Sequence, residues 1–109
     1  MKVKTNELSG AALDWAVAKI EAERKLFTIY PQYITPYSTD WAQGGPIIER
    51  EKTAIKENGY GHWFAKVGAG KWMRGPTPLI AAMRCCVASK SGKEIDVPEA
   101  LLNQKGESE

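Results

Sequence analysis

The sequence has one histidine and two cysteines, too few and too poorly spaced to close a metal site. Zinc needs four ligands of this kind, and the adjacent Cys85 and Cys86 with the lone His62 fall short. The two cysteines also cannot bridge each other, because neighbouring helical positions point about 100° apart. We therefore expect reduced thiols, which fit the cytoplasm, and neither a metal nor a cofactor.

Long apolar runs are missing as well. Residues 1–10 lack the apolar core of a signal peptide, and the longest weakly polar stretch, residues 76–83, is too short to span a membrane. We expect a cytoplasmic protein without a membrane segment.

Charge of one sign does not dominate, since 15 basic and 13 acidic residues leave a net charge of +2. The chain contains no run of lysine and arginine, and the basic residues near its helical segment 19–25 are interleaved with Glu21 and Glu23. A nucleic-acid binder usually carries a basic stripe. The sequence therefore gives no strong nucleic-acid signal.

What is present is the composition of an ordinary globular domain, with 43% hydrophobic and 26% charged residues. It predicts a single α+β domain over residues 1–102 and a disordered polar tail over 103–109. Local patterns predict three helices packed on a small, mostly antiparallel sheet. The helices are expected over residues 9–24, 46–57 and 78–91, and the strands over 1–5, 26–30, 62–67, 71–73 and 94–97, followed by a helical turn over 98–102.

Capping signals set the expected ends of the second and third helices. Pro46 and Pro78 suit the first helical position, where a missing N–H costs nothing. Thr77 precedes Pro78 as an N-cap, and Asn58-Gly59 is a stop signal for the second helix. The third helix is apolar or small nearly all round, so we expect it at the centre of the fold.

A long loop, expected over residues 31–45, is the first candidate site, because loops of this length are often functional. Its candidate ligand-binding residues are Asp40, Trp41, Gln43, Gly44 and Gly45. They lie before a helix, whose free N–H groups favour anions, and the glycines would let the backbone approach a ligand. In a purely structural interpretation, the glycines make a tight turn that Asp40 caps, and Trp41 packs in the core.

Arg74 and Thr77, before the third helix, complete this candidate site. Arg74 could hold a carboxylate or phosphate beside the helix N-terminus, or instead pair with a neighbouring acid in a rigid connector. In the pocket hypothesis, Trp41 stacks on the ligand, Asp40 and Gln43 fix its polar edge, and Arg74 holds its anionic group. No Walker loop or dinucleotide fingerprint accompanies these residues.

Catalytic groups do not stand out. His62 is more typical of a strand or surface residue, and Cys85 and Cys86, mid-helix among apolar residues, are typical of small hydrophobes. No spacing singles out a pair of carboxylates for acid–base work. The residues leave open whether the chain is an enzyme.

Three blocks of the sequence carry a family resemblance: ALDWAVAK at 12–19, STDWAQGGPII at 38–48 and GPTPLIAAMR at 75–84. In this order they resemble the NinX-like family of small bacteriophage proteins, and the resemblance covers most of residues 1–98. It implies expression from a phage or prophage in the bacterial cytoplasm. It supplies no catalytic residue, because the family has no established biochemical function.

Four tryptophans are many for so short a chain, and Tyr33 and Tyr37 add to the aromatic excess. Large aromatics either fill a small core or anchor an interface. The first functional hypothesis is therefore a non-enzymatic interaction module that binds a host or phage macromolecule, which requires Trp41 or Tyr37 to be exposed. The second is the small-molecule site described above. Homodimerisation is compatible with the sequence but has no direct signature.

Overall fold

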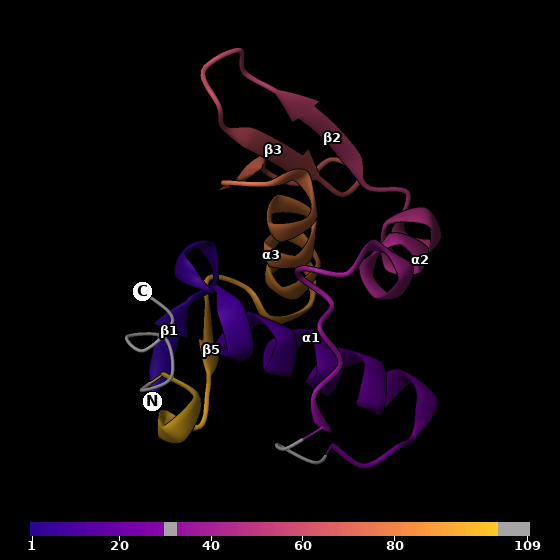
Figure 1. Cartoon of the computed structure of the whole chain (residues 1–109), viewed down its shortest axis with the longest axis vertical. Helices are drawn as coiled ribbons and strands as arrows, with labels where there is room; N and C mark the ends of the chain where they lie inside the picture. The colour runs from indigo at the N-terminus through magenta and orange to yellow at the C-terminus, as the bar shows by residue number, and fades with distance from the viewer. Residues whose placement is uncertain (30–32, 103–109) are drawn as a thin grey trace.

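The helix α3 (Pro78–Ser91) lies at the centre of the fold, as its sequence predicts. The computed structural model describes residues 1–29 and 33–102. The Thr77 hydroxyl accepts a hydrogen bond from the Ile80 N–H (3.1 Å), Pro78 occupies the first turn, and Gly92 is the C-cap. Buried side chains cover α3 nearly all round, and α1, α2 and both sheets pack against it (Figure 1).

The first helix, α1 (Gly10–Lys25), confirms the predicted helix and packs its buried Leu13, Ala16 and Val17 into the core with α3. The strand predicted over residues 26–30 is wrong for residues 26–29, and Tyr30 lies outside the described residues. Leu26 instead ends the helix in the left-handed conformation (φ 58°) and donates its N–H to the Ala22 carbonyl. Residues 27–29 pair with no described strand, so their β propensity has nothing to stabilise it.

The second helix, α2 (Trp41–Glu51), begins five residues earlier than predicted. Asp40 is the N-cap and accepts a hydrogen bond from the Ala42 N–H (3.0 Å), so this cap outweighs the start signal of Pro46. Pro46 therefore lies inside the helix, where its missing N–H leaves the Ala42 carbonyl without a helical partner. Because Ala42 is exposed, water can satisfy that carbonyl.

The early start of α2 also shortens the predicted loop. Residues 41–45 are helical, residues 33–40 are not α-helical, and residues 30–32 lie outside the described residues. The candidate residues from Trp41 to Gly45 therefore belong to the first turns of a helix and not to a loop.

A three-stranded antiparallel sheet follows α2, in the order β2 (Ala54–Glu57), β3 (Trp63–Lys66) and β4 (Met73–Gly75). The second helix was predicted to continue to residue 57, but Lys52 ends it (φ 55°) and the segment after it is β2. Asn58-Gly59 is thus a hairpin turn, in which the Asn58 side chain accepts hydrogen bonds from the Tyr60 and His62 N–H groups. The predicted β3 and the returning strand β4 are confirmed, with β4 displaced by two residues.

The strands β1 (Lys2–Lys4) and β5 (Glu94–Asp96) form a second, separate antiparallel sheet, in which Val3 faces Ile95 in register. The 3-10 helix η1 (Thr5–Glu7) follows β1, and the Thr5 hydroxyl donates to the carbonyls of Gly92 and Lys93. The α+β class is confirmed, but the strands divide into two sheets rather than one. In Figure 1, β2 and β3 lie above α3 and the β1–β5 pair lies below it to the left.

The predicted turn over residues 98–102 is helical over 99–102, and the predicted tail over 103–109 lies outside the described residues. No helix of the described chain combines the length and the apolar character needed to cross a membrane.

Candidate functional site

The sequence-predicted site divides between the starts of two helices. Asp40, Trp41 and Gln43 are exposed at the N-terminus of α2, and Thr77 is exposed at the N-terminus of α3. Gly44 joins the two, because a Cβ added to it would lie 2.6 Å from Leu79 Cδ1 in the first turn of α3. Only a glycine therefore fits this helix contact, which gives Gly44 a packing role. Gly45 is half-buried, with the Trp41 ring nearby.

Both helix N-termini at this place carry their own caps. The Asp40 carboxylate accepts the Ala42 N–H and the Thr77 hydroxyl accepts the Ile80 N–H, so each cap occupies one of the N–H groups that an anionic ligand would use. Arg74 lies on β4 beside Phe64 of β3, with its side chain exposed. Whether these residues bind a ligand stays a prediction.

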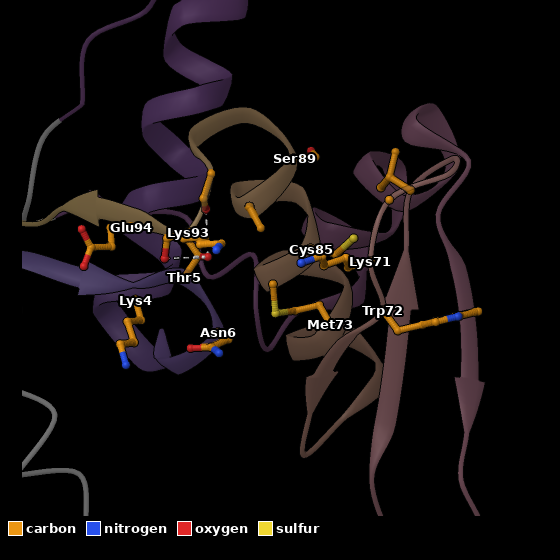
Figure 2. Close-up of a pocket in the computed structure, with 14 residues that line it drawn as sticks. Lys4, Thr5, Asn6, Lys71, Trp72, Met73, Cys85, Ser89, Lys93 and Glu94 are labelled. Atoms are coloured by element: carbon orange, nitrogen blue, oxygen red, sulfur yellow. Dashed lines mark hydrogen bonds between the residues drawn. The ribbon is translucent and has the colours of Figure 1, made fainter.

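A cleft of about 960 Å³ opens elsewhere, between the two sheets, with α3 as its floor. Figure 2 shows Lys4, Thr5 and Lys93 on one side of it and Met73 on the other, with Cys85 and Ser89 from α3 between them. None of the seven sequence-predicted residues lines this cleft. Sequence reasoning missed it because residues 4–6 on one wall lie about 60 to 90 positions from the other residues that line it.

The two thiols are poorly suited to nucleophilic chemistry. Cys85 and Cys86 are buried, and burial raises the pKa of both thiols, that of Cys86 to about 12. Thiolate, the reactive form, is therefore scarce at neutral pH. Among residues 1–29 and 33–102, no three His, Cys, Asp or Glu side chains converge in a way that could hold a metal ion.

A third feature is the outer face of the β2–β3–β4 sheet. Side chains alternate along each strand, and Ile55, Ala65 and Met73 point inward to the hydrophobic core. Their neighbours therefore point outward, and the register sets Lys56 opposite Phe64 and Phe64 opposite Arg74. We call this surface the cationic sheet face; its members are Lys56, Phe64, Lys66, Trp72 and Arg74.

Trp72 contacts two of the three cations of this face. Its ring is 38% exposed, and the ammonium nitrogens of Lys56 and Lys66 lie 4.2 and 4.9 Å from the ring centroid. Figure 2 shows Trp72 and Met73 pointing in opposite directions, Met73 into the cleft and Trp72 across the strands. The pairing of the strands thus brings residues that are far apart in the sequence onto one aromatic and basic surface.

Aromatic exposure differs among the tryptophans. Trp15 and Trp63 are half-buried against the core, whereas Trp41 is 53% exposed at the start of α2. Tyr37 packs partly against the core. The condition set by the interaction hypothesis, exposure of Trp41 or Tyr37, is therefore met by Trp41.

Fold and surfaces together define a small α+β domain with an open cleft and an aromatic, cationic sheet face. The family model described as Bacteriophage P22, NinX matches residues 4–90, and the chain belongs to this family of phage-associated proteins. The search of curated proteins found no match. All three sequence blocks that carry the resemblance lie within the matched residues.

Proposed function

We propose that this phage-associated protein is an interaction module that binds a macromolecule of the phage or its host through the cationic sheet face. One observation carries the proposal: Lys56 and Lys66 meet over the exposed ring of Trp72, and neither appears in an ion pair of the described chain. Like charges held side by side repel each other, and an anionic partner would relieve this repulsion.

The aromatic rings on this face add to that support. Exposed tryptophan supplies contact area at little entropic cost, and interface anchors are enriched in Trp, Tyr and Arg. Lys and Arg on the rim of such a surface steer an oppositely charged partner toward it. The proposed module therefore combines attraction at long range with aromatic contact at short range.

Affinity capture tests this proposal with matched variants. The immobilised protein, a face variant (Lys56→Glu with Lys66→Glu) and a control (Lys2→Glu with Lys25→Glu) are incubated with lysate of phage-infected bacteria. The control carries the same change of net charge on β1 and at the end of α1. We expect a partner that the wild type and the control retain and the face variant loses. Equal retention by all three proteins would contradict the proposal.

A second candidate function is small-molecule binding, which the cleft favours. Its volume suits a metabolite-sized ligand, and Lys4, Lys71 and Lys93 line it together with the apolar Met73 and Val67. An anionic ligand would fit this lining better than the helix starts at Asp40 and Thr77, where a side-chain cap already accepts one N–H group each.

Thermal unfolding against a panel of phosphorylated metabolites, nucleotides and sugars tests the second candidate. A ligand at about 100 times its dissociation constant stabilises the protein by about 2.7 kcal/mol, roughly 10 °C in Tm for a domain of this size. A cleft site predicts that Lys93→Ala removes the shift and Trp41→Ala keeps it. The opposite pattern would place the ligand at the sequence-predicted residues.

A further inference from the structure

We propose that the cationic sheet face binds single-stranded nucleic acid, with bases against Phe64 and Trp72 and phosphates against Lys56, Lys66 and Arg74. This inference rests on the proposed function and names the chemical class of the partner. It starts from the arrangement of charge, because the five residues of the face include three cations and no carboxylate.

The register shows how these cations converge. Lys56, Phe64 and Arg74 form one row across the three strands, and the Lys66–Trp72 contact extends the same face by a second row. Lys56 and Lys66 are ten positions apart in the sequence, and Arg74 follows eight positions later. The sequence contains no run of basic residues, but the pairing of the strands brings these three cations together into a basic stripe.

The positive charge alone would suit any polyanion, but the aromatic rings favour one class of polyanionic partner. Phe64 is absent from the side chains that pack on the hydrophobic core, whereas its neighbours Trp63 and Ala65 belong to them. The Phe64 ring is half-buried on the face, and Trp72 is 38% exposed with the ammonium groups of Lys56 and Lys66 over its ring, so a base that stacks on Trp72 takes the place of these groups as they move to the phosphates. Bases stack on exposed aromatic rings while cations follow the backbone, and this combination is typical of single-strand binding surfaces. An acidic peptide would use the lysines but leave the rings without a matching group.

The spacing of the rings favours a single strand over a duplex. Phe64 faces Arg74, and Trp72 directly precedes β4, so extending the register by one residue sets Trp72 diagonal to Phe64. Diagonal positions in an antiparallel sheet lie about 7–8 Å apart. Stacked bases of a duplex strand are about 3.4 Å apart. Two bases on these rings would thus be unstacked from each other, which a single strand permits.

Fluorescence anisotropy of the full-length protein with a labelled oligothymidylate of about 12 nucleotides tests this inference. We expect saturable binding that a duplex of the same length competes for poorly. The logarithm of the association constant should fall with the logarithm of salt concentration with a slope of about 2, from about 0.7 per phosphate contact. Lys56→Gln and Lys66→Gln should each reduce that slope by about 0.7.

Aromatic variants separate stacking from charge. Trp72→Leu and Phe64→Leu should each weaken binding by roughly 5- to 150-fold without changing the salt slope. Trp72 is 38% exposed and lies outside the hydrophobic core, and circular dichroism checks the fold of both variants. The control Lys2→Gln with Lys25→Gln should bind as the wild type does.

Three outcomes would overturn the inference. They are no binding of the oligonucleotide, binding that Trp72→Leu and Phe64→Leu leave unchanged, and equal affinity for heparin or for vesicles of anionic phospholipid. None of these would remove the proposed function if capture still yields a partner that depends on the face. Loss of that capture would overturn both.

Discussion

At the scale of single residues, the buried ion pair between Glu21 and Arg50 joins α1 to α2. Arg50 Nη1 and Nη2 donate to Glu21 Oε1 and Oε2 at 3.0 and 2.8 Å, and the Glu21 side chain is only 4% exposed. Burial acts to raise the pKa of Glu21, but the hydrogen bonds and the charge of Arg50 outweigh it and hold the pKa below its ordinary value.

Because of this ion pair, we expect that removing the arginine destabilises the protein by an amount that depends on pH. Arg50→Met leaves a buried carboxylate without a partner and should reduce the free energy of unfolding by about 3 kcal/mol at pH 7. In the wild type, the lowered pKa means that stability from Glu21 is present above the ordinary pKa and is lost as pH falls through the folded value. In Arg50→Met, burial without the arginine raises the pKa of Glu21. Protonation of its carboxylate as pH falls therefore reduces the destabilisation caused by the substitution.

The difference in unfolding free energy between wild type and Arg50→Met should therefore begin to shrink above about pH 4.5, as the variant's Glu21 is protonated, and shrink further below it, as the wild type loses its ion pair. Urea unfolding at a series of pH values measures it. Glu21→Gln with Arg50→Met, which removes the buried Glu21 carboxylate, is the control and should show a smaller pH dependence. A constant difference from pH 7 to pH 3.5 would show that Glu21 is not the group involved.

The cysteines support a second prediction at this scale. Because Cys85 and Cys86 are buried and the pKa of Cys86 is raised to about 12, neither thiol should react with a disulfide reagent in the folded protein at pH 7.5. Reaction should begin only as urea unfolds the chain, with both thiols reacting together. Rapid labelling of Cys85 under native conditions would contradict this prediction and show that its thiol is reached from the cleft that it lines.

At the scale of elements, the contact between α2 and α3 depends on Gly44. A Cβ at this position would overlap the Tyr37 carbonyl and lie 2.6 Å from Leu79 Cδ1. Gly44→Ala should therefore destabilise the protein by about 1–3 kcal/mol. Gly45, its neighbour in the same helix, meets only Trp41 Cε3 at 3.9 Å.

Gly45→Ala is the matched control and should be neutral or stabilise the protein by up to about 1 kcal/mol, because alanine favours a helix. Thermal unfolding of both variants makes the comparison. Equal effects of the two substitutions would refute a specific packing role for Gly44.

Elements with clear caps and periodicity could be predicted from the sequence. The ends of α3 follow their local signals, and Thr77 caps α3 as its position before Pro78 indicates. The failures occur where two local signals compete. Asp40 outweighs Pro46 as the start of α2, and Asn58-Gly59, which suits either a helix end or a hairpin, makes the hairpin.

The candidate site was harder to predict, because its surfaces depend on strand pairing. The sequence indicates an aromatic interaction surface and singles out Trp41, which is exposed. It does not reveal that Lys56, Lys66 and Arg74 share one face, since that requires the register of three strands. For the same reason the cleft between the two sheets could not be anticipated.

At the scale of the whole molecule, α3 holds two small sheets apart and leaves their exposed surfaces for binding. The inward residues of the β2–β3–β4 sheet complete the core, so its outward residues are free to serve a partner. The cationic sheet face, the cleft and the helix starts at Asp40 and Thr77 are three surfaces on one scaffold, of which the first two adjoin at Trp72. Mapping the residues that a bound probe contacts shows which of these surfaces binds it.

The most direct measurement is a titration of the ¹⁵N-labelled protein with oligothymidylate, followed by amide chemical shifts. The cationic sheet face predicts changes concentrated at residues 54–57, 63–66 and 72–75, with β1, β5 and the start of α2 unaffected. Changes concentrated at residues 4–6 and 92–94, or at 40–45 and 77, would place binding in the cleft or at the helix starts. Either of those patterns, or a spectrum that does not change, would contradict the account.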